Sequence, residues 1–212
     1  TNSFITNIPS FITHKSINLK KLLNTIGENY SVIVIPDFLF NRMSNKEDDY
    51  KKIEVEEEMV LDIRNNWHVL EDYIFELRKK YRNKVKKIIK ETNKVEIRKL
   101  ESEQLDSLHI EMQDLFDQVV KSSRFSGPEF DISSFILFVK QDLMQVNGYF
   151  LDNKLIGFSS EIRDTKTLYS YYVGFDKKLN NSLPIYGRIL IENINNAIQL
   201  KKEKLILGRT AN

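Results

Sequence analysis

The sequence predicts an α/β protein with a mixed, mostly antiparallel β-sheet flanked by helices. One observation is the last third, Gly148 to Asn212, which alternates short apolar strands with turn residues and then gives a helix and a further strand. Another is the placement of glycine, since five of the seven glycines fall between Gly148 and Gly208. Glycine marks places where the backbone bends or is closely approached, so we expect the functional site in this stretch.

Composition restricts the class of protein. Hydrophobic residues make up 41% and charged residues 29% of the 212 positions, as in folded globular proteins. The chain has no cysteine, which excludes disulfides, thiolate metal sites and a cysteine nucleophile. The acidic segment 45–58 lacks the spacing of a calcium loop, and we expect no metal. No signal peptide and no apolar run of about 18 residues is visible, so we expect a cytoplasmic protein without a membrane span.

Helical periodicity is strongest from Trp67 to about Lys90, where a single helix of about six turns is predicted. Its apolar stripe comprises Trp67, Leu70, Ile74, Leu77, Tyr81, Val85 and Ile88. The other face is acidic in the early turns and basic in the later ones, which suits the helix dipole. The basic run is either an ordinary solvated face or a surface that contacts phosphates, and its candidate contacts are Arg82, Lys84, Lys86 and Lys87.

The stretches before the last third predict further helices and strands. A helix is expected over 17–26 and a buried strand over 31–35. A strand follows at Val95–Leu100, and then a helix from Ser102 to about Arg124. A further helix is expected from Ile132 to Val146, with Ile136, Val139 and Leu143 facing inward and Gly148 ending it.

The last third predicts a three-stranded meander that continues into a β-α-β unit. The strands are expected at 149–151, 155–162 and 168–175, with turns at 152–154 and 164–166. A helix begins at Pro184, a residue favoured in the first turn, and a strand follows at 205–207. A strand–helix–strand crossover normally makes its two strands parallel, which gives the mixed sheet.

Several segments in this order resemble a known family. They are Met59-Val60-Leu61, Trp67 through Lys80-Tyr81-Arg82, Gly148-Tyr149-Phe150, Lys154-Leu155-Ile156-Gly157-Phe158 and Leu207-Gly208-Arg209-Thr210-Ala211. Together they resemble the GNAT acyltransferase fold, and more narrowly the bacterial GNAT-like proteins related to the Fem peptidyltransferases of cell-wall cross-bridge synthesis. The resemblance extends from the predicted strand at Ser31 to Asn212.

This resemblance implies a transferase that moves an acyl or aminoacyl group onto an amine of the cell envelope or of a small molecule. The implied donor is an acyl-CoA or an aminoacyl-tRNA, so tRNA is a possible partner. Since family members often carry two GNAT-like halves, residues 1–60 are expected to be the tail of a first half and residues 61–212 the acyltransferase domain. Relatives continue past the Gly-Arg-Thr-Ala segment, so this domain is expected to be truncated at its C-terminus.

Acyl transfer to an amine needs a base, donors for the oxyanion and an acid for the leaving group. The candidate bases are Glu161 and Asp176, and the alternative for both is an ordinary solvent-facing position. Tyr172 is the candidate acid, with Tyr171 and Tyr186 as further acids or substrate walls. Because Tyr171 and Tyr172 are adjacent in a strand, they are expected on opposite faces.

The resemblance to the GNAT fold implies a donor site between the last strand of the meander and the strand that follows the helix. Its candidate residues are Val173, Gly174, Tyr186, Gly187 and Arg209. Gly174 is expected to allow a bulge that presents an amide. The start of the Pro184 helix offers free amides to an anion, and Arg209 is either an anion ligand or part of a surface ion pair.

One segment departs from the acetyltransferase pattern. The usual phosphate loop has an arginine or glutamine and two spaced glycines, whereas this chain has Asn180-Asn181-Ser182-Leu183-Pro184-Ile185-Tyr186-Gly187 with one glycine. The departure favours an aminoacyl-tRNA or another donor over acetyl-CoA. It also leaves open a second function, a non-catalytic GNAT-like module that docks an anionic partner through the basic helix.

Overall fold

The computed structural model describes residues 58–121 and 130–209, together with the separate positions 17–18, 21, 24–25, 43–44 and 51. The chain divides into two compact units, Thr1–Glu56 and Glu57–Asn212. In the first unit, β1 (Ile17–Asn18) pairs in parallel with β2 (Met43–Ser44). The helix predicted over 17–26 is therefore wrong at its first two residues. The strand predicted over 31–35 lies outside the described residues.

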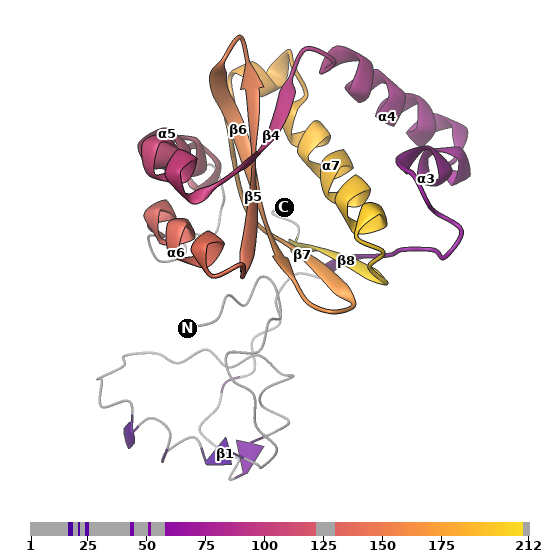
Figure 1. Ribbon diagram of the computed structural model, residues 1–212. Coiled ribbons are helices and arrows are strands. Elements are labelled where there is room, and N and C mark those ends of the chain that lie inside the picture. Colours follow the sequence, from indigo (N-terminus) through magenta and orange to yellow (C-terminus); the bar gives the residue numbers. More distant parts are fainter. Residues whose placement is uncertain are drawn as a thin grey trace. The chain divides into compact units, whose positions relative to one another are not determined.

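The second unit is built on a six-stranded sheet with the order β3-β8-β7-β6-β5-β4 (Figure 1). The strands are β3 (Glu58–Asp62), β4 (Glu96–Leu100), β5 (Met144–Leu151), β6 (Lys154–Arg163), β7 (Thr167–Phe175) and β8 (Lys204–Arg209). Only the β7–β8 pair is parallel, and every other neighbouring pair is antiparallel. The predicted mixed, mostly antiparallel sheet is confirmed.

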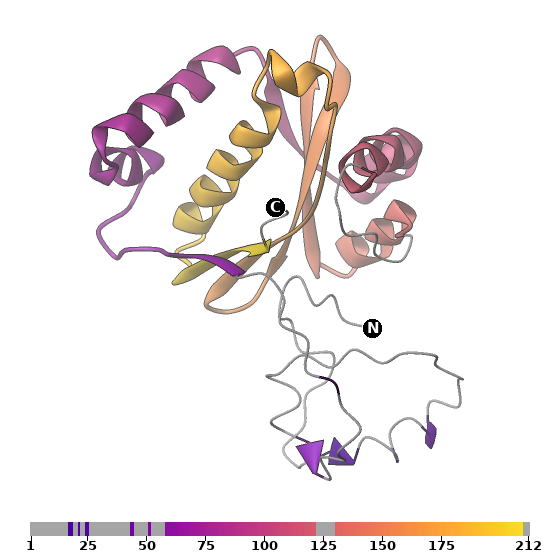
Figure 2. The same ribbon diagram turned by 180° about the vertical axis from the view of Figure 1, so that it is seen from behind.

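Helices cover both faces of this sheet, as the two opposite views show (Figures 1 and 2). One face carries α5 (Ser102–Val120) and α6 (Phe135–Lys140), over a core that contains Leu105, Met112, Phe135 and Phe158. The other face carries α7 (Ile185–Gln199), against which α3 (Leu70–Glu76) and α4 (Lys79–Glu91) pack. Short 3-10 turns lie at Ile132–Ser134 (η1) and Leu179–Asn181 (η2).

The predicted meander and β-α-β unit are present between Gly148 and Arg209, although the first strand, expected at 149–151, already begins at Met144. Asp152 and Asn153 both have positive φ, 49° and 64°, as a two-residue hairpin loop between β5 and β6 requires. The β7–α7–β8 crossover makes its two strands parallel. The residues expected to form the inner face of α7, Ile185, Ile189, Ile194, Ala197 and Ile198, are all buried.

The single helix predicted over 67–90 is wrong, because two helices meet at Leu77 and Arg78. Both residues have extended ψ angles of 144°, which ends α3 before α4 begins. Arg82 stabilises this break, since its Nη2 donates hydrogen bonds to the carbonyl oxygens of Phe75 at 2.6 Å and Leu77 at 2.9 Å. Tyr81, predicted in the apolar stripe, is exposed. The apolar periodicity of the sequence does not reveal this break, because the hydrogen-bond donor that stabilises the end of α3 is the side chain of Arg82 in α4.

The helix predicted from Ile132 to Val146 is also too long. The helical part ends at Lys140, Asp142 has a φ of 54°, and β5 already begins at Met144. Leu143, predicted to face inward, is exposed, and Gly148 lies within β5 rather than at the end of a helix. Backbone hydrogen bonding to β4 and β6 makes Met144–Val146 part of a strand, so tertiary contacts override the helical spacing of the apolar residues.

Gly174 permits the closest approach between the sheet and α5. A Cβ atom at this position would lie 2.3 Å from Phe158 Cε1 and 2.7 Å from the backbone nitrogen of Phe116. Because the backbone of α5 cannot yield as a side-chain tip can, this glycine is required for the packing of α5 on β7.

We expect Gly174→Ala to lower the free energy of unfolding by about 2 kcal/mol or more, since overpacking against backbone forces α5 outward. The matched control is Gly187→Ala, whose Cβ would meet only the Ile88 side-chain tip at 2.9 Å. The control should change stability by less than about 1 kcal/mol, because helix propensity offsets the contact. Urea unfolding followed by circular dichroism measures both, and equal stabilities for the two variants would contradict this account.

Candidate functional site

The parallel strands β7 and β8 pair over only part of their length. Their register joins Thr167 to Lys204, Leu168 to Leu205 and Tyr169 to Ile206, and no described pair continues from Ser170 to Phe175. On the other edge of β7, the N–H of Asp176, directly after the strand, donates to the carbonyl oxygen of Ile156 in β6. Since backbone groups alternate in direction along a strand, those of Phe175 and Val173 point toward the β8 side. This part of β7 therefore presents backbone groups that β8 does not use.

A β-bulge lies at the point where the two strands part. In the β6–β7 ladder Glu161 pairs with Ser170 and Ser159 with Val173, so Tyr171 and Tyr172 together oppose Ser160. The Ser160 hydroxyl accepts a hydrogen bond from the Tyr172 N–H and donates one to its carbonyl oxygen, each at 2.9 Å. The sequence placed the bulge at Gly174, which is wrong by two to three residues.

The bulge also overturns the prediction that Tyr171 and Tyr172 face opposite sides of the sheet. Their ring centroids lie 4.3 Å apart, and both rings pack on the α5–α6 side, where Tyr172 also contacts Phe116 and Phe130. Two-residue alternation fails here because one extra residue is inserted in β7. Burial raises the pKa of the Tyr171 hydroxyl, and the neighbouring Tyr172 raises it further.

In the first turn of α7, two backbone N–H groups already donate hydrogen bonds to other groups of the protein. The N–H of Tyr186 donates to Asn180 Oδ1 at 2.9 Å, and the N–H of Ile185 donates to the carbonyl oxygen of Leu183 at 2.7 Å. The Tyr186 ring stacks on Phe175 at 5.4 Å, and Gly187 faces Ile88 of α4. This helix start is therefore partly closed by protein groups where the sequence suggested a bound anion.

The structure also places two further candidate residues, Asp176 and Val173, and the backbone of a third, Arg209. Asp176 follows β7, and its Oδ1 accepts a hydrogen bond from the N–H of Leu179 at 2.9 Å, which holds the η2 turn. Val173 is half-buried and packs on the α7 side of the sheet. Arg209 is the last residue of β8, where its backbone pairs with Glu58, and its side chain lies outside the described part of the chain.

Glu161 is fully buried between β6 and α7, and the solvent-facing alternative for this residue is wrong. Its Oε1 accepts a hydrogen bond from Asn196 Nδ2 at 2.9 Å, while Oε2 has no partner among the described residues. Burial raises the pKa of the Glu161 carboxyl to about 7, against the smaller opposing effect of the Asn196 hydrogen bond. A carboxyl with this pKa can both take up and release a proton near neutral pH.

Glu161 belongs to a buried polar cluster that sequence reasoning missed. Asn193 Nδ2 donates to Ser170 Oγ at 2.9 Å, and the Tyr149 hydroxyl lies 3.3 Å from Ser159 Oγ. One sequence signal was available, since Asn193 stands four residues after Ile189 and thus on the apolar face of α7. The α7 face of the sheet is therefore polar at its centre, whereas the α5 face is apolar and aromatic.

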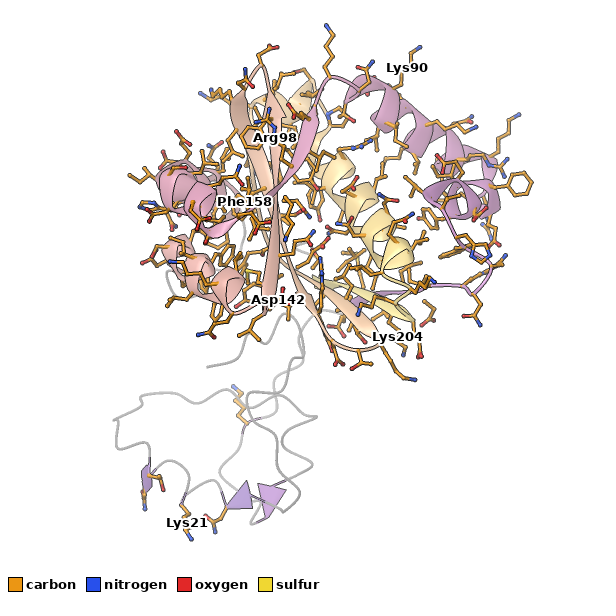
Figure 3. All side chains as sticks on the ribbon, in the orientation of Figure 1. Lys21, Lys90, Arg98, Asp142, Phe158 and Lys204 are labelled. Atoms are coloured by element: carbon orange, nitrogen blue, oxygen red, sulfur yellow. The ribbon has the colours of Figure 1, made fainter. Side chains whose placement is uncertain are left out.

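The candidate anion contacts on α4 divide into two kinds. Arg82 bonds to the end of α3 and lies over the Phe75 ring, so it has a structural role. Lys84, Lys86 and Lys87 are exposed, as is Lys90, which Figure 3 labels at the end of the helix. A groove of about 420 Å³ between α3 and α4 has the apolar side chains of Ile74, Phe75 and Ile89 beside Arg82, Lys86 and Lys90.

A smaller cavity of about 90 Å³ lies where β5 begins and β6 ends. Its polar lining comprises Lys99, Glu101, Asp142, Gln145 and Arg163; Asp142 is labelled in Figure 3. Across the described residues, no cluster of three or more histidine, aspartate or glutamate side chains could hold a metal ion. Within the same residues, no helix is both long and apolar enough to cross a membrane.

Sheet order, helix placement and the parting of β7 from β8 define a GNAT-like α/β fold. Comparison with solved structures agrees with this class. FemX matches with a TM-score of 0.56 and 12% identity over 79% of this chain and 56% of that chain. L-PGS from Bacillus licheniformis matches with a TM-score of 0.52 and 13% identity over 73% of this chain and 46% of that chain.

A conserved protein of unknown function from Bacteroides thetaiotaomicron matches with a TM-score of 0.51 and 11% identity, over 72% of this chain and 53% of that chain. The chain thus spans about half the length of these three proteins. A scan against models of known protein families finds no match, and a search of curated proteins finds none either. At these identities the likeness shows the fold, and the narrower Fem-like relationship stays a prediction.

The buried carboxyl predicts a pH-dependent stability. Glu161 has a pKa of about 7 in the folded chain and an ordinary value of 4.5, so between these pH values the folded state binds more protons than the unfolded state. Stability therefore falls as pH rises through this window, by about 3 kcal/mol in all. Glu161→Gln should remove this loss, so that the variant is more stable than the parent at pH 8 and about equal at pH 4.

Chemical unfolding across pH 4 to 8 measures the difference between the two proteins. The exposed Glu111→Gln serves as the control, since it alters charge without altering a buried group. A constant difference between parent and Glu161→Gln over the whole range would show that Glu161 titrates normally.

Proposed function

We propose that this protein is an N-acyltransferase that moves an acyl or aminoacyl group to an amine acceptor. The observation that carries the proposal is the parting of β7 from β8 after Tyr169, just before the Tyr171–Tyr172 bulge. An extended donor can lie along the unused edge of β7 and bond to its backbone groups, as an added strand would. The acceptor is an amine of the cell envelope or of a small molecule, and the compartment we propose is the cytoplasm.

Glu161 is our candidate for the general base. It pairs across the ladder with Ser170, the last residue of β7 before the bulge, and its carboxyl is poised to exchange a proton near pH 7. Tyr172, the acid that the sequence suggested, has its ring on the α5–α6 side of the sheet, whereas Glu161 lies on the α7 side, so we do not place both groups at one reacting centre. Val173 is the candidate residue for donor contact along the strand, since its backbone groups point toward the β8 side, whereas those of Gly174, the other residue that the sequence suggested, face Phe158 of β6. Arg209 is a candidate anion ligand at the end of β8. Asp176 remains a weaker candidate base, because its carboxylate already holds the η2 turn.

The start of α7 bears on the choice of donor. Asn180 accepts the hydrogen bond of the Tyr186 N–H, and Ile88 packs on Gly187. The first turn of α7 therefore has fewer free N–H groups for a pyrophosphate than an uncapped helix N-terminus has. This arrangement favours an aminoacyl-tRNA over acyl-CoA, with Lys84, Lys86 and Lys87 as phosphate contacts. We further propose that residues 1–60 are the tail of a preceding GNAT-like half and 61–212 the acyltransferase domain.

A second candidate function is a non-catalytic module that docks an anionic partner on α4. The specific observation in its favour is the exposed row of lysines beside an α7 start that protein groups partly fill. This docking function requires the exposed lysines of α4 but does not require the unpaired edge of β7.

Binding of a donor should raise the melting temperature. At a concentration of about 100 Kd the stabilisation is about 2.7 kcal/mol, which corresponds to about 5 °C or more for a chain of this size. The measurement is a thermal shift with acetyl-CoA, CoA, aminoacyl-tRNA and uncharged tRNA. We expect the largest shift with aminoacyl-tRNA. Equal shifts with charged and uncharged tRNA, without transfer to any amine, would favour the docking module; no shift with any of the four would refute the proposed transferase.

Phosphate contact by the basic helix should be sensitive to salt. The triple change of Lys84, Lys86 and Lys87 to Ala should weaken tRNA binding at least about tenfold and reduce the slope of log K against log salt by about 2 to 3. A matched control changes the exposed Lys121, Lys140 and Lys201 to Ala, which preserves net charge relative to the first triple variant. Filter binding across a salt series decides, and equal weakening by both triple variants would mean that only overall charge matters.

A further inference from the structure

A strip of polar side chains runs along the α7 face of β5 and β6 toward the surface. Gln145 lies directly opposite Glu161 in the ladder, and Asn147 and Arg163 are two residues away along their own strands, so all four share one face. Gln145 joins its neighbours, because its Nε2 donates to Asn147 Oδ1 at 3.0 Å and its Oε1 accepts from Arg163 Nη2. The strip thus extends from the buried carboxyl to a half-buried amide and an exposed guanidinium.

Several buried atoms of this strip lack a partner among the described residues. They are Glu161 Oε2, Asn147 Nδ2 and, on α7, Asn193 Oδ1. An unpartnered buried polar atom costs about 1 to 3 kcal/mol, so native structures usually satisfy such atoms with ordered water. Here donors and acceptors alternate within one strip, which is an arrangement that bridging water molecules can satisfy.

Water can reach this strip through the cavity of about 90 Å³, which Gln145 and Arg163 both line. A water molecule needs about 10 to 15 Å³ of such volume, so the cavity holds several. Gln145 therefore contacts the cavity and lies across the ladder from Glu161.

We propose that Glu161 exchanges its proton with solvent through water in this cavity, with Gln145 orienting the water and Arg163 stabilising the carboxylate. The proposal deepens the proposed function and rests on Glu161 as its base. An acceptor that enters as R–NH3⁺ carries three protons on nitrogen. When the C–N bond forms and the bond from carbonyl carbon to leaving group breaks, one proton stays on the amide and one goes to the leaving group. The third proton passes to Glu161 and then to water.

The charged and titratable groups around Glu161 agree with this route. On its own strand, Arg163 stabilises the carboxylate, while Glu192 of α7 opposes it. Tyr149 of β5 is fully buried and neutral, and Arg188 of α7 pairs with Glu192 at 3.6 Å. Lys99 of β4 lines the cavity. The cavity lining also holds Glu101, which pairs with Lys99 at 2.9 Å, and Asp142, so Arg163 is the cation of this lining that acts on the Glu161 carboxylate.

The kinetic test uses Gln145→Leu, which keeps the size of the side chain and removes its polar atoms. We expect kcat to fall at least about tenfold with little change in KM, because proton release becomes slow. Small buffers such as imidazole should restore the rate as their concentration rises. The exposed Gln199→Leu is the control and should behave as the parent. A Gln145→Leu rate equal to that of the parent, or a lowered rate that no buffer restores, would overturn the proposal.

A second measurement keeps the test independent of activity. Carbon-13 NMR follows the titration of the Glu161 carboxyl in the parent and in Arg163→Gln and Arg163→Lys. We expect Arg163→Gln to raise the pKa of Glu161 by about 0.5 to 1 unit and Arg163→Lys to leave it nearly unchanged. If the parent transfers no acyl group, only the proposed function fails. A Glu161 titration that is identical in all three proteins would overturn the coupling of the carboxyl to this strip.

Discussion

The hydrogen bonds between the Ser160 side chain and the backbone of Tyr172 are the constraint on which the site depends. They fix an extra residue in β7 and so turn Tyr171 and Tyr172 toward the same face of the sheet. The strand bends at this bulge, and its pairing with β8 ends two residues earlier. Both features of the candidate site, the aromatic wall and the unused strand edge, follow from this one local insertion.

The two faces of the sheet serve different purposes. On the α5 face, Gly174 allows the helix backbone to approach so closely that the layer is a dense apolar core. On the α7 face, Glu161, Asn193 and Ser170 leave the centre of the layer polar. Such a polar centre costs stability, and proteins keep such groups where function requires them. The dense face therefore provides rigid support for the bulge, and the polar face is where our proposal places the proton chemistry.

The sequence predicted those parts of the fold that local chemistry determines. The hairpin at Asp152-Asn153 and the inner face of α7 are examples, since turn residues and 3.6-residue spacing act over a few positions. It failed where distant groups decide. Arg82 supplies the partners that divide α3 from α4, and pairing with β4 and β6 makes a strand of Met144–Val146. Burial of Glu161 likewise depends on α7 crossing above it, which no local pattern encodes.

The relation between α4 and α7 links the two candidate functions. Ile88 of α4 packs on Gly187 in the first turn of α7, the turn that would otherwise face a donor pyrophosphate. The same helix carries Lys84, Lys86 and Lys87 on its exposed side. Packing of α4 therefore covers the helix start where the sequence suggested an anion, and α4 carries the lysines that we propose as phosphate contacts. Lysines hold an anionic donor by point charges instead of by oriented backbone amides. Its binding should therefore be strong at low salt and should tolerate different placements of the phosphates. A large polyanion such as tRNA meets those conditions better than a compact pyrophosphate does.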